Sequence, residues 1–109
     1  MAQVLPDERE LRRVIGDGEG IPDGEVEGLD ESDLIELYRS MVTLRTYDER
    51  SVVYHRQGRI GTYAIFWNHE AMQAGSVYAL ERGDWIFPSY RESAIGLLRG
   101  MPVSTVLSW

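Results

Sequence analysis

The residues with the clearest chemical potential lie in the stretch Ser89-Tyr90-Arg91-Glu92. It follows a proline and has the Ser-x-x-Glu pattern of a capping box, in which serine and glutamate side chains bind free backbone N–H groups at the start of a helix. Tyr90 and Arg91 would then occupy the first helical turn, where the N–H groups and the helix dipole favour an anion, and a guanidinium suits phosphate or carboxylate. Taken alone, the pattern fits an ordinary capped surface helix with a salt-bridged arginine better than a binding site.

Further motifs accompany this stretch in a definite order along the chain. They are Tyr38-Arg39-Ser40-Met41 with Arg45-x-x-Asp48-Glu49-Arg50, Arg56-Gln57-Gly58-Arg59-Ile60-Gly61, His69-Glu70-Ala71 and Phe87-Pro88-Ser89-Tyr90-Arg91-Glu92. Together they resemble the N-terminal part of the alpha subunit of the thiamine-diphosphate-dependent 2-oxoacid dehydrogenases, of the pyruvate and branched-chain types. The resemblance covers roughly residues 30 to 109 and leaves out the first 28.

The resemblance implies two groups of site residues. Because the family's Tyr-Arg pair contacts the cofactor, the implied cofactor-binding residues are Ser89, Tyr90 and Arg91. The segment after the glycine turn borders the substrate pocket in the family, so the implied substrate-binding residues are Thr62, Tyr63, Ala64 and Tyr90. Some pyruvate-type members have a histidine where this chain has Ala64, which weakens a pyruvate assignment without excluding it.

The same resemblance implies an activity and partners. The family decarboxylates a 2-oxo acid on thiamine diphosphate, with Mg²⁺, and passes the acyl group to a lipoyl domain; the cofactor supplies the difficult chemistry. The implied partners are the beta subunit, in an alpha2-beta2 assembly, and the lipoyl-bearing acyltransferase. The family's metal ligands lie downstream of position 109 and its catalytic glutamate belongs to the beta subunit. We therefore expect no catalytic residue and no metal ligand in this chain, and no activity from it alone.

A protein of a different class is the alternative. In a non-catalytic helical interaction module, Arg45, Glu49 and Arg91 would form structural ion pairs and would not meet a cofactor. A Gly-Asp-Gly motif followed by paired asparagines beyond Trp109 would decide for the enzyme.

Length, charge and composition narrow the class of protein. The chain has 109 residues, about one domain, whereas the family's subunit is much longer, so it resembles a front piece. A formal net charge of −7 argues against nucleic acid as a partner, since phosphate backbones need a basic surface. The absence of cysteine excludes disulfides and thiolate sites. No apolar run approaches the ~18 residues of a membrane span, and the mixed N-terminal charges fit neither a secretory signal nor a transit peptide. We expect a cytoplasmic protein without membrane contact.

Residues 1–28 differ in composition from the rest of the chain. Their glycines and acidic residues cannot bury enough apolar surface to offset the entropy of ordering, which predicts a mobile, irregular arm. Gly16-Asp17-Gly18 matches the start of the family's metal and diphosphate motif. That motif ends in paired asparagines, however, and the only asparagine in the chain is Asn68. We therefore interpret this tripeptide as a loop that binds no metal.

Residues 29–109 contain the elements that would position the motifs. A long helix is predicted over 29–57, ended by Gly58, with an apolar stripe formed by Leu34, Leu37, Tyr38, Met41, Val42 and Leu44. Within it Arg45 and Glu49 are spaced for a salt bridge, with an inter-helix or inter-subunit pair as the alternative, and His55 is expected to be a surface histidine. A second helix is predicted over 68–80, capped by Asn68. Its small residues leave room for a neighbour from this chain or from another subunit, and they are Ala71, Gly75 and Ala79.

The remaining segments are predicted to be shorter. We expect an extended piece over 62–67, a strand over 85–87, a helix over 89–99 ended by Gly100, and a last helix beginning at Pro102. The sequence pattern alone predicts a mainly helical chain with short strands. The resemblance implies an α/β fold, a doubly wound parallel sheet, of which residues 29–109 form the leading and mostly helical segment.

Overall fold

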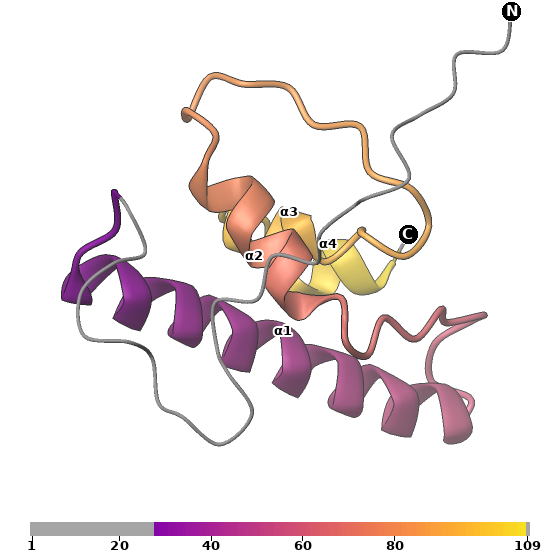
Figure 1. Cartoon of the computed structure of the whole chain (residues 1–109). Helices are drawn as coiled ribbons and strands as arrows, with labels where there is room; N and C mark the ends of the chain where they lie inside the picture. The colour runs from indigo at the N-terminus through magenta and orange to yellow at the C-terminus, as the bar shows by residue number, and fades with distance from the viewer. Residues whose placement is uncertain (1–27, 109) are drawn as a thin grey trace, which may run out of the picture. The chain divides into compact units, whose positions relative to one another are not determined.

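A computed structural model describes residues 28–108. The chain divides into two units, Met1–Asp30 and Glu31–Trp109. The second contains four helices, α1 (Glu31–Arg56), α2 (Glu70–Tyr78), α3 (Ile95–Leu98) and α4 (Val103–Leu107). Helix α2 packs on α1, α3 packs on α2 and α4 packs on α3 (Figure 1). All but the last residue of the arm predicted over residues 1–28 lies outside the described residues, as does the Gly16-Asp17-Gly18 loop.

Helix α1 confirms the long helix predicted over 29–57. Acidic residues lie in its first turn and His55 and Arg56 in its last, which complements the helix dipole. It ends at Arg56, two residues before Gly58, whose φ of 69° is in the left-handed region. The N–H of Gly58 donates to the His55 carbonyl at 2.9 Å and that of Arg59 to the Tyr54 carbonyl at 3.0 Å, the pair of bonds of a Schellman motif. Gly58 therefore stops the helix as predicted.

The core lies between α1 and the elements packed on it. Its buried members are Leu44, Tyr47, Phe66, Ala74, Ala94 and Val106. The predicted apolar stripe of α1 is only partly buried, since Leu44 is enclosed and Leu37 and Met41 pack against the core, whereas the exposed members are Leu34, Tyr38 and Val42. The described elements thus cover one strip of α1 and leave the adjoining apolar residues in contact with solvent.

Helix α2 begins later than predicted, and Asn68 is not its cap. The residue at the N-cap position is His69, without a side-chain capping bond. Asn68 has a φ of 70°, a left-handed conformation that asparagine tolerates better than most residues but that differs from the extended conformation of a cap. Glycine would adopt the same region readily. Asn68 therefore has a backbone conformation that glycine could also supply.

The small residues of α2 face away from its neighbours within the chain. Ala71, Gly75 and Ala79 are exposed, and a Cβ added at Gly75 would meet no atom within 4 Å. Helix α2 instead packs through Gln73 and Ala74, which are buried. The prediction that these small residues pack closely against another part of residues 28–108 is therefore wrong. Their contact with another subunit stays a prediction.

The strands predicted from sequence are not formed in the part of the chain that the structure describes. The extended segment 62–66 has no ladder partner there, and the backbone N–H of Phe66 donates to the Asp48 carboxylate at 3.2 Å instead. Residues 85–88 also have no regular structure. A strand needs a neighbour to accept its backbone hydrogen bonds. Residues 28–108 are mostly helical, and the doubly wound sheet stays a prediction.

The helix predicted over 89–99 is much shorter than expected. Only Ile95–Leu98 is helical, and a series of turns with i to i+3 hydrogen bonds precedes it. The predicted stop is confirmed, because Gly100 has a φ of 86° and donates to Leu97 while Met101 donates to Gly96. Helix α4 follows Pro102 directly, with Val106 in the core. No helix within residues 28–108 has the length and apolar character needed to cross a membrane.

Candidate functional site

A cavity of about 460 Å³ brings the two groups of predicted site residues together. Residues 60–64 and 88–90 contribute to its lining, as do α1 and α4. Its lining residues are Tyr47, Ile60, Gly61, Thr62, Tyr63, Ala64, Pro88, Ser89, Tyr90, Ser93, Val106 and Leu107. All the predicted substrate-binding residues and two of the three predicted cofactor-binding residues are among them. The volume lies in the range of small-molecule sites.

Asp48 on α1 fixes the part of the lining formed by residues 60–66. Its carboxylate is 2% exposed and accepts hydrogen bonds from the Tyr63 hydroxyl at 2.7 Å and the Phe66 N–H at 3.2 Å. Burial and the bond to Asp48 raise the pKa of Tyr63 well above its ordinary value of 10.0, so its hydroxyl stays a neutral donor. The Tyr47 ring packs against both neighbours, edge-on to Tyr63 and stacked on Phe66.

Asp48 is a functional candidate whose role could not be assigned from sequence. It occurs in the Arg45-x-x-Asp48 motif, but a charged residue on a helix is usually solvated. The signal that could have found it is the buried stripe of α1, where Leu44, Tyr47, Asp48 and Ser51 recur at the i, i+3, i+4, i+7 spacing of one helix face. A carboxylate within such a stripe needs donors from outside its own helix.

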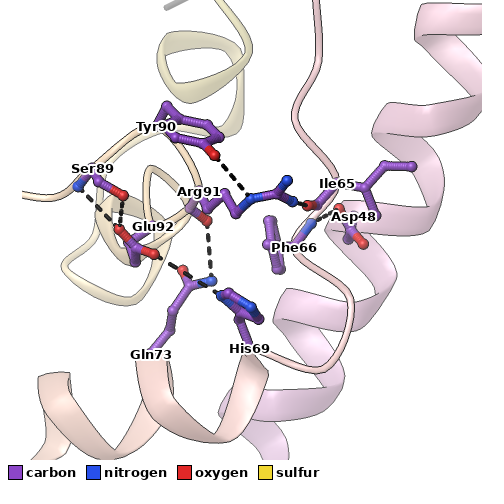
Figure 2. A network of polar contacts seen from close by, with 9 residues as sticks. All are labelled: Asp48, Ile65, Phe66, His69, Gln73, Ser89, Tyr90, Arg91 and Glu92. Atoms are coloured by element: carbon purple, nitrogen blue, oxygen red, sulfur yellow. Dashed lines mark hydrogen bonds and ion pairs between the residues drawn. The ribbon is translucent and has the colours of Figure 1, made fainter.

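Ser89 and Glu92 form the predicted side-chain contacts without starting a helix. The backbone N–H of Ser89 donates to the Glu92 carboxylate at 3.0 Å, and its hydroxyl donates to the same oxygen (Figure 2). These bonds lower the pKa of Glu92 below its ordinary value of 4.5. The box closes one turn, and helix α3 begins only at Ile95. The predicted helix start at Ser89 is therefore wrong, and no helix dipole contributes to an anion site there.

Arg91 lies beside the cavity and is not among its lining residues. Its Nη1 donates to the carbonyl of Ile65, and its Nε donates to the Tyr90 hydroxyl at 3.3 Å (Figure 2). The guanidinium carbon also lies 5.3 Å from the centre of the Tyr90 ring. The Arg91 side chain thus joins the segment before α2 to the turn that carries Tyr90. Its Nη2 makes no hydrogen bond to any residue between 28 and 108.

Comparison with known proteins agrees with this arrangement. Residues 38–109 match the sequence model of the family described as "Dehydrogenase E1 component". The chain belongs to the dehydrogenase E1 component family. This confirms the family predicted from the motifs.

The E1 component relatives are much longer than this chain. A pyruvate dehydrogenase E1 component subunit alpha of Staphylococcus aureus (strain N315) is 42% identical over 79 residues, which are 72% of this chain and 21% of that protein. A protein of the same name from Staphylococcus epidermidis (strain ATCC 12228 / FDA PCI 1200) is 40% identical over 88 residues, which are 81% of this chain and 24% of that protein. The chain therefore spans between a fifth and a quarter of these curated relatives. No solved structure gives a significant match.

The residues of this E1 component segment fit a cofactor that carries a diphosphate. No acidic side chain is among the described residues that line the cavity; the carboxylates of Asp48 and Glu92 are bonded to the lining residues Tyr63 and Ser89. Arg91 supplies planar donors, and Thr62 and Tyr90 add hydroxyl groups, all suited to phosphate oxygen atoms. No group of three or more histidine, cysteine, aspartate or glutamate residues that could hold a metal ion occurs within residues 28–108.

The remaining charged residues of the E1 component segment have structural contacts. Arg45 pairs with Glu70 of α2, with Nε 2.5 Å from Oε1, and this inter-helix pair replaces the predicted Glu49 pair. The hydrogen bond from Arg45 lowers the pKa of Glu70, which is 7% exposed. His55 is an exposed surface residue, as predicted, and its Nδ1 lies 2.7 Å from the Gly61 carbonyl oxygen.

Proposed function

We propose that this chain is a segment of the alpha subunit of a 2-oxoacid dehydrogenase complex, an enzyme of the oxidoreductase class. The observation that supports this most is the cavity, because residues 62–64 and 89–90 line it together in a chain that matches the E1 component family. In the complete subunit the reaction would be oxidative decarboxylation of a 2-oxo acid with transfer of the acyl group to a lipoyl domain. Thiamine diphosphate, when bound, supplies the carbanion chemistry.

The residues of this chain would bind and orient the reactants. Arg91 would neutralise diphosphate charge with Nη2, which makes no hydrogen bond within residues 28–108. Tyr90 would contact the diphosphate or the substrate, and Ser89 would hold the turn that presents both. Thr62, Tyr63 and Ala64 would line the substrate side of the cavity. The neutral Tyr63 hydroxyl is committed to Asp48, so Tyr63 would shape this side and would not transfer a proton.

The substrate and partners follow from the same proposal. The names of the relatives favour pyruvate, and branched-chain 2-oxo acids are the alternative substrate class. Mg²⁺ would be held by ligands outside residues 28–108 together with the diphosphate. The partners would be the beta subunit, in an alpha2-beta2 assembly, and the lipoyl-bearing acyltransferase. We place the assembly in the cytoplasm.

The non-catalytic interaction module remains the second candidate. It is favoured by the contact between Arg91 and the Ile65 carbonyl, and by the position of Arg91 outside the cavity lining. In this role Arg91 would only join two segments of the chain. The two candidates differ in whether removal of the Arg91 side chain changes cofactor binding.

A calorimetric titration with thiamine diphosphate at fixed Mg²⁺ tests the proposal. The sample is the full-length subunit that contains this sequence, purified with its beta subunit. We expect Arg91→Ala to weaken binding about 10 to 150-fold, the value of a charge-assisted contact of roughly 1.5 to 3 kcal/mol. Arg91→Lys should recover only part of the loss, since an ammonium group cannot make the two-pronged contact.

Arg56→Ala is the matched control for this titration, because Arg56 is exposed in the last turn of α1. Arg99 is unsuitable as a control because its guanidinium donates to the carbonyls of Glu81, Arg82 and Asp84 and holds that turn. Binding by Arg91→Ala within about twofold of the parent protein would contradict the cofactor role and favour the interaction module.

A further inference from the structure

Gln73 on α2 is the most deeply buried polar side chain near the proposed cofactor site. It is 0% exposed and is among the largest fully enclosed side chains of the described chain. Its Nε2 donates to the backbone carbonyl of Arg91 at 3.4 Å, at the long end of hydrogen-bond distances (Figure 2). Gln73 thus reaches from the core of the protein to the backbone of the residue proposed to meet the diphosphate.

A second polar side chain lies one helical turn before Gln73. His69 is four residues earlier, on the same face of the chain entering α2, and its Nδ1 is 4.0 Å from a carboxylate oxygen of Glu92. Both the Nδ1 of His69 and the Oε1 of Gln73 are buried without a hydrogen-bond partner among residues 28–108. Gln73 of α2 and His69 just before it therefore face the turn over residues 89–92 (Figure 2), and Gln73 is fully enclosed whereas the His69 side chain is 42% exposed.

Such groups are costly in a protein core. Burial of an amide without its full set of hydrogen bonds destabilises the folded state, and an apolar side chain of equal volume would avoid this penalty. Buried unsatisfied groups in native proteins concentrate where function requires them. Packing alone therefore does not explain why glutamine occupies position 73.

The turn over residues 89–92 needs support from outside itself. It is closed by one backbone bond, from the Glu92 N–H to the Ser89 carbonyl at 3.2 Å, and by the Ser89–Glu92 side-chain contact. Tyr90 is 72% exposed, so the turn buries little surface of its own at this point. Gln73 of α2 and His69, at its N-cap position, make polar contacts with this turn.

We propose that Gln73 is a positioning residue for the cofactor site. It fixes the Arg91 carbonyl and, through the backbone, sets the direction in which the Arg91 guanidinium meets an anion. His69 faces the same turn, with its Nδ1 4.0 Å from a carboxylate oxygen of Glu92. This inference rests on the proposed function, because it assigns Gln73 a role in diphosphate binding that operates through Arg91.

Gln73→Met separates positioning from packing, since methionine keeps a similar volume and removes both the donor and the unpaired oxygen. We expect the melting temperature of the 109-residue chain to stay unchanged or to rise, because a buried unsatisfied group is lost. In the full-length subunit with its beta partner, the dissociation constant for thiamine diphosphate should rise about threefold to tenfold, as for the loss of one hydrogen bond. The matched control is Gln57→Met, at an exposed position just after α1.

The double variant Gln73→Met with Arg91→Ala tests whether Gln73 acts through Arg91. If it does, the double variant should bind no more weakly than Arg91→Ala alone, because coupled residues are not additive. Fully additive losses, unchanged binding by Gln73→Met, or a fall in melting temperature that accounts for weaker binding would each overturn the proposal.

A measurement without cofactor keeps the two proposals distinguishable. In ¹⁵N spectra of the 109-residue chain, Gln73→Met should shift the Arg91 Nε–H resonance and Gln57→Met should not. An unshifted resonance overturns the positioning role whatever the cofactor result. If the resonance shifts but the parent subunit binds no thiamine diphosphate, the proposed function fails, and with it the assignment of Gln73 to a cofactor site. If the parent subunit binds thiamine diphosphate and Gln73→Met does not change that binding, the positioning role alone fails.

Discussion

Residues 60–66 and residues 84–92 both contribute to the cavity, and they differ in how their conformation is fixed. The first segment is tied to α1 by the buried Asp48 carboxylate and inserts Phe66, 1% exposed, into the core. The second has Trp85 and Phe87 stacked on each other but 85% and 87% exposed. Among the described residues, the side chains of Gln73, Arg91 and Arg99 bond it to other parts of the fold, and its two ends also bond to the adjacent residues Glu81 and Ile95.

The substrate side of the proposed site, residues 60–66, is thus anchored to α1 and to the core. The cofactor side, residues 84–92, is held by a few polar contacts. Only the Arg91 side chain joins the two segments by a hydrogen bond between described residues, through the Ile65 carbonyl. Substitutions in the first segment should therefore act on folding. Substitutions in the second should act on binding with little effect on the stability of the chain.

The largest contrast is expected between two phenylalanines. Phe66→Ala should lower the free energy of unfolding by about 3 to 5 kcal/mol, because it empties a core position. Phe87→Ala should change it by less than about 0.5 kcal/mol, since the ring is exposed. Urea denaturation of the 109-residue chain, followed by circular dichroism, measures both. Similar losses for the two variants would show that the second segment is as firmly packed as the first.

A somewhat smaller effect is expected from the carboxylate that anchors the first segment. Asp48→Ala leaves the Tyr63 hydroxyl and the Phe66 N–H without their acceptor, which should lower the free energy of unfolding by about 2 to 4 kcal/mol. Asp48→Asn keeps one acceptor and should lose about half as much. Glu49→Ala, at the exposed neighbouring position, is the control. Equal stability of the Asp48→Ala and Glu49→Ala variants would refute the anchoring role.

The smallest effect is expected at the Arg45–Glu70 pair, which joins α1 to α2. The bond from Arg45 holds the pKa of Glu70 below 4.5, so the pair stabilises the fold above about pH 4.5 and this contribution is lost as the pH falls through the lower, folded-state pKa. Glu70→Gln should cost about 1 kcal/mol near pH 7, since Arg45 is partly solvated.

Denaturation curves of the parent chain and Glu70→Gln, recorded from pH 7 down to pH 3, measure this difference. The two curves should converge as the solution becomes acidic. A gap that stays constant over this range would mean that the loss at pH 7 comes from packing and not from charge.

Much of the fold could be predicted because its signals are local. The apolar spacing of α1 and the glycines at positions 58 and 100 act through nearby backbone bonds, and each prediction is confirmed. The pairing of residues 62–64 with Tyr90 came from the family resemblance, since no spacing along the chain shows that they share a cavity.

Other features depended on contacts that the sequence does not display. The Ser89–Glu92 box closes a single turn. No helix continues from this box, because the Arg91 side chain donates to the Ile65 carbonyl and the Arg91 carbonyl accepts from Gln73. The expected strands have no ladder partner within residues 28–108. The importance of Asp48 appears only when its donors, more than a dozen residues away, fold against it.

The left-handed backbone at Asn68 bears on how segments of this kind are found in genomes and altered in the laboratory. A search pattern that demands glycine before the His-Glu-Ala motif would pass over this chain, although its backbone turns as glycine would allow. The property that matters at this position is a dihedral angle that two residue types can supply. Patterns written in terms of allowed backbone angles, with glycine and asparagine treated as equivalent, would recover more distant members and would mark Asn68→Gly as a safe exchange in sequence design.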